Sequence, residues 1–465
     1  MTQSELGAAH ADSTQTIAAF TTAKDKTEST IGRLIILDEA GMVGTDDMQK
    51  VLQKLKKNDR ILLVGDPKQL RSVAAGNVYA DYLANGTIQY ATINEIKRQK
   101  DSKLLAISTA FAEGSPADAM ELAQEYMHEV EPEKTGNDKN GKPVATKEDK
   151  IRAIVEQTVS QYLSLTPKDR ADTIVLSVQN DMRKAINDQI RDGLVAEGAV
   201  SNISTEIQVV HASDMTTEHR RQAHKYSEDA VLREIGRNGT YTDWKIVAID
   251  GEKNTLTMRA GDKEKTMDPS DLNPHQWRVY EQKTMGLAAG DKIVILENDN
   301  KNKLYNGNTL DVKEIKNGKI YGILPSGEER IIDTTKPQNL DLAYCLTVHK
   351  SQGKTVSNTI FAAYSGAVAS AEAAYVAMSR EKYRLSIITD SVKEMSGKIV
   401  GWSARDTASQ RGTDMDMASH EKMDEAIAEG ATQAAIHLKS LEIEEETIGN
   451  SGSGIGQVDE AEAGE

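Results

Sequence analysis

The sequence predicts an α/β protein with two parallel-sheet domains and a β-rich insertion in the second. Short apolar runs alternate with helical patterns up to about residue 200 and again from 340 to about 400, which is typical of parallel sheets. Between residues 201 and 339 the pattern changes to short alternating strands separated by turn signals such as Asn306–Gly307. A chain of 465 residues is long enough for two to four domains, each with its own core.

The first domain is expected over residues 1–128 and contains two apolar strands that end in polar residues. Residues 34–37 read LIIL and are followed by Asp38 and Glu39, while residues 61–64 read ILLV and are followed by GDPKQL. Nucleotide-hydrolysing α/β domains need such a pair of carboxylates, since one binds the metal and the other positions a water. An acidic helix start after a strand is the alternative reading, because carboxylates are favourable there.

The first part of the second domain is expected over residues 150–200. It follows an exposed loop or insertion at 129–149 that is rich in Lys, Glu, Gly, Asn and Pro. Apolar residues at helical spacing predict a helix over Lys150–Leu165. After the insertion at 201–339, the second domain is expected to continue over residues 340–400. Its remaining expected elements are a strand at Asp172–Ser177, a helix at Asp181–Glu197, and strands beginning at Leu342, at Thr359–Phe361 and at Leu385–Asp390.

The insertion at 201–339 is expected to be a small antiparallel β-barrel or a pair of sheets. Its expected strands are Trp244–Ile249, Thr255–Met258, Lys292–Leu296, Leu310–Val312 and Lys319–Leu324. Residues 401–465 read as helical stretches that lead into a disordered acidic tail.

Composition limits the classes of protein to consider. No apolar run approaches the roughly 20 residues needed to span a membrane, and no signal peptide is evident. The single Cys345 lies in an apolar run and excludes an intrachain disulfide, so we expect a cytoplasmic protein without membrane insertion. The net charge of −16 argues against broad coating of nucleic acid but allows a locally basic channel. Three basic clusters read either as solvated helix faces or as contact surfaces: Lys54–Arg60, Lys97–Lys103 and His219–Lys225.

Further along the chain, four polar patterns suggest phosphate chemistry. Gln69 follows a sheet edge, where its amide can hydrogen-bond a γ-phosphate. Arg98 in EIKRQ is either a bidentate phosphate ligand or an ordinary helix-surface arginine. The run TVHKSQG at 347–353 places many hydrogen-bonding side chains after an apolar strand, which suits a phosphate backbone or a base. Arg380 ends a short apolar helix and can act as an arginine finger.

Together and in this order, LDEAG, GDPKQL, EIKRQ, TVHKSQG and VAMSR resemble motifs II to VI of superfamily 1 DNA helicases. The RecD-like branch is most similar, and within it the helicase part of the conjugative relaxase-helicases of the TraI/TrwC type. The resemblance covers roughly residues 1 to 395, with Thr2 and Gln3 in a segment like motif Ia. It implies two RecA-like domains, the first with motifs Ia to IV and the second with motifs V and VI.

The resemblance also implies ATP and Mg²⁺ as cofactors, single-stranded DNA as the partner and movement from 5′ to 3′. ATP would bind between the two domains, and the inserted barrel would help to grip the strand. Asp38 would coordinate magnesium, Glu39 would be the catalytic base, Gln69 would sense the γ-phosphate, and Arg98 and Arg380 would neutralise charge. The residues implied in nucleotide binding are Gly65, Asp66, Gln69, Arg98, Gly353 and Arg380, and those implied in DNA binding are Thr347, His349, Ser351 and Gln352.

The phosphate loop G-x-x-x-x-G-K-[ST] that such an ATPase needs does not occur in the sequence. Gly136 to Lys142 has the glycine spacing but continues with Pro143, and the GKT at 353–355 has Val348 where the first glycine belongs. In the family this loop precedes motif Ia, so we expect a first domain that is truncated at its N-terminus, without the loop and without the relaxase domain.

Three explanations stay open at this point: a gene fragment, a degraded copy that binds single-stranded DNA without turnover, or a partner chain that supplies the loop. The function hypotheses are accordingly a DNA helicase of conjugative transfer and a non-catalytic single-stranded-DNA-binding module derived from one. An acidic scaffold that recruits other conjugative transfer proteins is the third.

Overall fold

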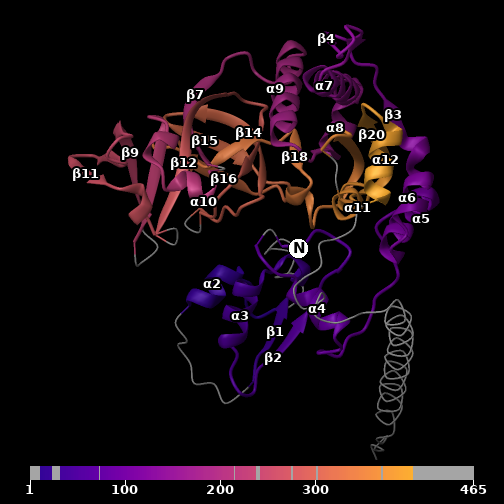
Figure 1. Ribbon diagram of the computed structural model, residues 1–465, viewed down its shortest axis with the longest axis horizontal. Coiled ribbons are helices and arrows are strands. Elements are labelled where there is room, and N and C mark those ends of the chain that lie inside the picture. The colour runs from indigo at the N-terminus through magenta and orange to yellow at the C-terminus, as the bar shows by residue number, and fades with distance from the viewer. Residues whose placement is uncertain are drawn as a thin grey trace, which may run out of the picture. The chain divides into compact units, whose positions relative to one another are not determined.

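A computed structural model describes residues 11–23, 32–72, 74–213, 215–236, 241–273, 276–299, 302–367 and 370–401 (Figure 1). Its residues group into two compact units. The first unit contains the described residues up to Leu122, those from 370 to Ser379 and those from Gly397 onward; the second contains Ala123 to 367 and Arg380–Ser396. The segment around motif Ia and the acidic tail, on which we made predictions, lie outside the described residues.

The first unit is built on two parallel strands, β1 (Leu34–Leu37) and β2 (Arg60–Leu63). Side chains alternate between the two faces of this pair, so Leu37 and Leu63 share one face and join a small core with Met48 of helix α3 (Thr45–Gln53). The helices α2 (Ile17–Thr22) and α4 (Val78–Ala84) and the short η1 (Ala40–Met42) complete this part of the unit.

Three more helices belong largely to the first unit: α5 (Ser102–Glu113), α6 (Pro116–Ala123) and α11 (Ala371–Ala377). Asp101 caps α5 by accepting hydrogen bonds from the amides of Lys103 and Leu104, as expected for an N-terminal aspartate. The rings of Phe111 and Tyr375 stack with their centroids 5.6 Å apart and join α5 to α11. A helix far along the sequence is thereby fixed against the first unit.

The second unit contains a five-stranded parallel sheet in the order β18-β6-β19-β20-β3. Helices α7 (Lys147–Ser164) and α9 (Asn180–Ala196) pack against each other and against this sheet. A capping box between Thr146 and Asp149 starts α7. The strands are β18 (Cys345–Thr347), β6 (Thr173–Ser177), β19 (Val356–Ala363), β20 (Glu381–Thr389) and β3 (Met127–Glu129), and the short helix α8 (Pro167–Ala171) precedes β6.

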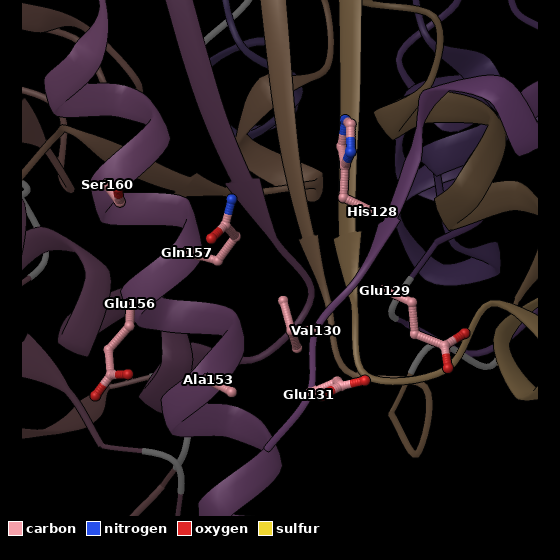
Figure 2. A pocket seen from close by; sticks show the side chains of 8 residues that line it. All are labelled: His128, Glu129, Val130, Glu131, Ala153, Glu156, Gln157 and Ser160. Carbon is pink, nitrogen blue, oxygen red and sulfur yellow. The ribbon is translucent and has the colours of Figure 1, made fainter. Parts of the chain in front are cut away.

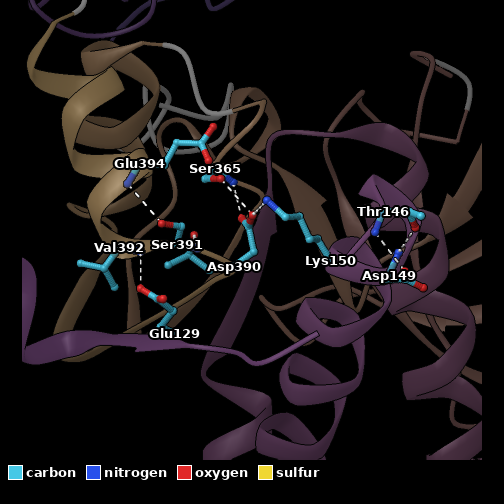
Figure 3. A network of polar contacts seen from close by, with 10 residues as sticks. Glu129, Thr146, Asp149, Lys150, Ser365, Asp390, Ser391, Val392 and Glu394 are labelled. Carbon is cyan, nitrogen blue, oxygen red and sulfur yellow. Dashed lines mark hydrogen bonds and ion pairs between the residues drawn. The ribbon is translucent and has the colours of Figure 1, made fainter. Parts of the chain in front are cut away.

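A polar network at the end of β20 ties α7 and α12 (Val392–Val400) to the sheet (Figure 3). The buried Asp390 carboxylate lies 3.0 Å from Lys150 Nζ and accepts hydrogen bonds from the amide and hydroxyl of Ser365. Glu129 on β3 accepts a 2.8 Å hydrogen bond from the Val392 amide at the start of α12. The contact with the Asp390 carboxylate raises the pKa of Lys150, so the Lys150 amine stays charged.

The inserted region forms two antiparallel sheets, one of six strands and one of five. Among the described residues the two sheets have separate hydrogen-bonded orders and are linked by one parallel bridge between Val209 and Gln338, which fits the predicted pair of sheets. The first has the order β11-β10-β9-β8-β12-β7 and consists of β7 (Thr205–Ala212), β8 (Ala230–Ile235), β9 (Tyr241–Asp250), β10 (Thr255–Ala260), β11 (Lys263–Met267) and β12 (Trp277–Leu287). The second has the order β16-β15-β14-β13-β17 and consists of β13 (Lys292–Ile295), β14 (Thr309–Lys316), β15 (Lys319–Ile323), β16 (Glu329–Asp333) and β17 (Leu340–Leu342).

These elements confirm the predicted fold class of two RecA-like α/β parts with a β-rich insertion, and every strand expected in the insertion is present. One local prediction was wrong. The apolar run around Leu342 is two strands in two sheets, because Ala343 donates its amide to Lys292 and ends β17 before β18 begins. Within the loop or insertion predicted at 129–149, Glu129 ends β3 of the parallel sheet and β4 (Gly136–Asn137) pairs with β5 (Pro143–Val144).

Candidate functional site

In the first unit, the polar residues after β1 and β2 meet at one edge. Asp38 and Glu39 follow β1 directly and both are half-buried. Glu39 adopts a left-handed backbone with φ of 52°, which turns the chain sharply into η1. The Ala40 amide then donates a 2.8 Å hydrogen bond to the carbonyl of Val64, the residue after β2. The two strand-end segments are therefore joined by backbone.

Gly65 permits this close approach. A Cβ at this position would lie 3.1 Å from the Ala40 nitrogen and 3.3 Å from the Gly41 nitrogen, tighter than ordinary contact. The Tyr79 hydroxyl donates a 2.9 Å hydrogen bond to the Gly65 carbonyl. Burial, together with the nearby charge of Asp66, raises the pKa of Tyr79, so the phenol stays protonated and keeps donating.

Asp66 and Gln69 form the next turn of this edge. The Gln69 side-chain amide lies 3.3 Å from Asp66 Oδ2 as a hydrogen-bond donor, and the Lys68 amide donates to Asp66 Oδ1 at 2.9 Å. The structure thus brings Asp38, Glu39, Gly65, Asp66 and Gln69 to the carboxyl end of one parallel strand pair. Their roles in nucleotide binding stay predictions.

The side chain of Arg98 is held by a backbone carbonyl group. Its Nη1 donates a 2.6 Å hydrogen bond to the carbonyl of Ser379, and the buried Gln99 donates to the same oxygen at 3.2 Å. Ser379 directly precedes Arg380 in the sequence. Arg98 therefore holds the residue that directly precedes the second predicted arginine, a link between positions 281 residues apart that no sequence pattern indicated.

Arg380 itself is 1% exposed and is among the largest fully buried side chains of the described chain. Its carbonyl accepts a 3.1 Å hydrogen bond from the Val356 amide at the start of β19. A buried guanidinium needs partners, and Arg380 has further polar interactions in this structure.

In the second unit, the TVHKSQG segment follows the edge strand β18. Thr347 ends the strand and His349–Ser351 form the short helix η5. Of the four predicted DNA contacts here, Ser351 is buried and donates its hydroxyl to the Val348 carbonyl at 2.7 Å, which closes the turn. His349 has an exposed side chain, yet neighbouring protein atoms displace part of its hydration and lower its pKa. The ring is accordingly poised as a neutral hydrogen-bonding group.

Gly353 completes this loop with a φ of 77°, a region that favours glycine. The Val348 amide donates to the Ser177 carbonyl at the end of β6, at 3.2 Å, so this loop too is joined to the neighbouring strand. Gln352 lies between them and takes part in polar contacts. The DNA-binding roles of Thr347, His349, Ser351 and Gln352 stay predictions.

Sequence reasoning missed the residues of α9 that hold β18. Asn187 donates to the Cys345 carbonyl at 3.0 Å and accepts from the Cys345 amide at 2.8 Å. One turn earlier, Arg183 donates to Asp341 at 2.8 Å. Both side chains are buried. A signal was available, since both lie beside the apolar positions Met182, Ile186 and Ile190 of an amphipathic helix, where an unpaired polar residue is costly.

Lys350, in the same loop, was not among the residues predicted to have a role. Burial and the nearby charge of Arg183 lower its pKa, while Asp341 acts in the opposite direction. Lys350 of the TVHKSQG loop therefore lies close enough to Arg183 and Asp341 to be affected by both charges, and Arg183 is itself paired with Asp341 at 2.8 Å.

One hollow of the described structure lies elsewhere. It measures about 790 Å³ and lies between β3 and α7, as Figure 2 shows. It is lined by His128, Glu129, Val130, Glu131, Ala153, Glu156, Gln157 and Ser160. None of the predicted site residues is among them, so this hollow is not the predicted site.

The carboxylates that follow β1 supply only part of the ligands that a phosphate-bound magnesium ion needs. Mg²⁺ usually takes one or two carboxylates and completes its shell with waters and phosphates, and the adjacent Asp38 and Glu39 supply carboxylates of that kind. Among the described residues no three His, Cys, Asp or Glu side chains form a metal-holding group. No helix in the described part of the chain is long and apolar enough to cross a membrane.

The fold and these strand-end loops define the class: proteins built from two RecA-like α/β parts with a β-rich insertion. A family model described as "AAA domain" matches residues 1–131, and one described as "DNA relaxase TraI 2B/2B-like domain" matches residues 211–287. The multifunctional conjugation protein TraI of Escherichia coli is 23% identical over 431 residues, which cover 83% of this chain. The RecBCD enzyme subunit RecD of Haemophilus influenzae is 22% identical over 389 residues, which cover 77% of this chain and 51% of RecD.

The chain is therefore homologous to TraI-type relaxase-helicases and to RecD-like superfamily 1 helicases, as its ordered motifs predicted. It spans 23% of the length of TraI. Among solved structures, the Pif1 helicase from Bacteroides in complex with ADP-AlF3 and ssDNA aligns over 83% of this chain and 81% of its own, with 15% identity and a TM-score of 0.44.

Proposed function

We propose that the chain is the motor part of an ATP-dependent DNA helicase of conjugative transfer, one that moves along single-stranded DNA from 5′ to 3′. The observation that carries the proposal is the edge where Asp38, Glu39 and Gln69 converge at the carboxyl ends of β1 and β2. Carboxylates and an amide at this position suit a magnesium-bound phosphate and an attacking water. Homology to TraI and RecD supports the same reading.

In this proposal Asp38 would hold magnesium, Glu39 would orient the water, and Gln69, supported by Asp66, would sense the γ-phosphate. Arg98 and Arg380 balance the charge that develops during phosphoryl transfer. ATP supplies the phosphoryl group. The exposed His349 and the neighbouring Thr347 and Gln352 contact the DNA strand, while the buried Ser351, predicted as a fourth contact, closes the turn that presents them.

The 465 residues contain no G-x-x-x-x-G-K-[ST]. This favours a second candidate, a module that holds single-stranded DNA without turnover. Both candidates share the DNA-binding loop after β18 and differ only in nucleotide chemistry, so a single pair of assays separates them.

The first assay is ATP hydrolysis by the purified chain, with and without single-stranded DNA, and Glu39→Gln as the control. DNA-stimulated turnover that the control abolishes supports the motor. The second assay is binding of a labelled oligothymidylate, with His349→Ala expected to weaken it. Binding without turnover supports the holding module, and absence of both activities contradicts the proposal.

A further inference from the structure

The hollow between β3 and α7 of the second unit takes no part in the proposed function (Figure 2). Its volume of about 790 Å³ is within the range of pockets that hold ligands. One wall is the stretch 128–131, and the other is the face of α7 that carries Ala153, Glu156, Gln157 and Ser160. Both walls belong to secondary structure or directly continue it, so an occupant would find the hollow already formed, which lowers the cost of binding.

The wall at 128–131 belongs to the edge of the parallel sheet. Among the described strands, β3 is the last in the order of this sheet, so its outer side has no strand partner there. The Val130 amide donates a 2.9 Å hydrogen bond to the Thr389 carbonyl of β20. Since the backbone groups of successive residues in a strand point to opposite sides, the amide and carbonyl of Glu129 point away from β20.

An edge of this kind can accept a further strand from another chain. Pro132 follows Glu131 directly and has no amide hydrogen to donate, so the edge accepts only a short segment. The Glu129 carboxylate accepts a 2.8 Å hydrogen bond from the Val392 amide, which ties this edge to the start of α12. The edge is therefore both open to an added strand and held in place.

The hollow carries negative charge on both walls. Glu131 and Glu156, one on each wall, are exposed, and in the part of the chain that the structure describes no ion pair engages either carboxylate. The two basic residues of α7 nearest to Glu156 in sequence, Lys150 and Arg152, each pair with an aspartate that does not line the hollow. Of the lining residues only His128 can carry a positive charge, against three glutamates. This charge suits a cationic occupant.

Apolar surface lies beside these carboxylates. Val130 packs partly against the main core of the unit, and Ala153 is half-buried. Gln157 and Ser160 add an amide and a hydroxyl on the α7 wall. Lysine and arginine side chains combine an apolar stem with a charged head. The lining therefore matches basic side chains better than it matches simple cations or apolar groups.

We infer that this hollow docks a short, extended segment of a partner protein that is rich in lysine and arginine. The segment adds as a strand to β3, and Glu131 and Glu156 bind its basic side chains. Side chains two residues apart share one face of a strand, so basic residues at alternate positions of the segment would face the carboxylates. A second copy of this chain suits the hollow less, because a chain with a net charge of −16 repels itself. The inference is independent of nucleotide and DNA binding.

The test measures binding of the labelled peptide acetyl-Lys-Val-Arg-Val-Lys-Val-amide to the full chain by fluorescence anisotropy. Exposed ion pairs contribute about 0.5–1 kcal/mol each, so a Glu131→Gln/Glu156→Gln variant should bind the peptide roughly 5-fold to 30-fold more weakly. A Glu228→Gln/Glu252→Gln variant removes the same charge from exposed positions elsewhere in the second unit and should bind as the unaltered chain does. Fluorescence of the buried Trp244 and Trp277 checks that both variants remain folded.

Peptides methylated on alternate backbone nitrogens, in the two possible registers, test the added strand. The register that points its amides at β3 should lose roughly 10-fold or more in affinity, and the other register should keep it. Equal binding of both methylated peptides would overturn the inference, and so would unchanged binding by the Glu131→Gln/Glu156→Gln variant. An equal loss in the Glu228→Gln/Glu252→Gln variant would reflect net charge alone and also overturn it. Spermine that displaces the peptide at an equal concentration of positive charge would show a small-cation site instead. Failure of the unaltered chain to bind the peptide overturns the inference and leaves the proposed function standing.

Discussion

Replacement of Asn187 by Ala should destabilise the second unit and loosen the loop that follows β18. Within the described part of the chain β18 is an edge strand of the parallel sheet, so one side of its backbone has no strand partner there. The Asn187 amide takes that place by donating to the Cys345 carbonyl and accepting from the Cys345 amide. All three groups are buried, and water does not replace the lost partner easily.

The magnitude follows from these two hydrogen bonds. Each contributes about 1 kcal/mol net, and each leaves a buried backbone group unsatisfied at a cost of about 1–3 kcal/mol when removed. Alanine regains roughly 0.5 kcal/mol of helix propensity in α9. We therefore expect a loss of about 2–4 kcal/mol in the free energy of unfolding.

Urea unfolding followed by the fluorescence of Trp244 and Trp277 reports on this unit. The midpoint should fall without a change in the slope of free energy against urea. Gln189→Ala, on the exposed side of the same helix, should change the free energy by less than about 0.5 kcal/mol. Hydrogen exchange at the Cys345 amide should accelerate in the Asn187 variant. A loss below about 0.5 kcal/mol, with unchanged exchange, would refute the argument that Asn187 stands in for a strand.

Three further outcomes are expected. Gly353→Ala forces a side chain into a left-handed backbone, so the free energy of unfolding should fall by about 1–2 kcal/mol and oligonucleotide binding should weaken. The control Gly327→Ala, at a φ of 86° in a hairpin turn, should lower the free energy of unfolding by a similar amount without affecting binding. The Asp188 side chain is exposed, yet neighbouring protein atoms displace part of its hydration, and this loss together with the charge of Asp341 raises its pKa. The carboxylate therefore opposes folding above that pKa, so Asp188→Asn should stabilise the chain at pH 7, and the gain should vanish below about pH 3. Burial raises the pKa of the Cys345 thiol to about 12, so a thiol reagent should leave the folded chain unmodified and label one cysteine in denaturant.

The sequence was sufficient to predict the fold class because strand and helix periodicities are local properties. Both β6 and α9 begin and end within one residue of the predicted bounds, because the sequence pattern of each is unambiguous. That the segments after β1 and β2 lie at one edge of the sheet was also predictable, because parallel strands end at the same edge.

Contacts between distant segments were not predictable. Arg98 looks the same in sequence whether its guanidinium contacts a phosphate or the Ser379 carbonyl. The three basic clusters also looked equivalent, and only the structure shows which cations have partners. Ser351 appeared as one more polar contact, whereas its buried hydroxyl closes a turn. Each of these distinctions depends on a partner that is remote in the sequence or supplied by backbone, and neither kind leaves a periodic trace.

The same structural device positions both sets of predicted functional residues. After β1, the Ala40 amide bonds to the carbonyl that follows the neighbouring strand β2, and after β18 the Val348 amide bonds to the last residue of the neighbouring strand β6. The loops thereby satisfy backbone carbonyls that a parallel pair leaves exposed where it ends. Because these bonds are made by backbone, the positions of Glu39 and His349 follow from strand register more than from their own side-chain contacts. Substitutions that alter the pairing of β1 with β2, or of β18 with β6, should therefore impair function even where no predicted site residue is changed.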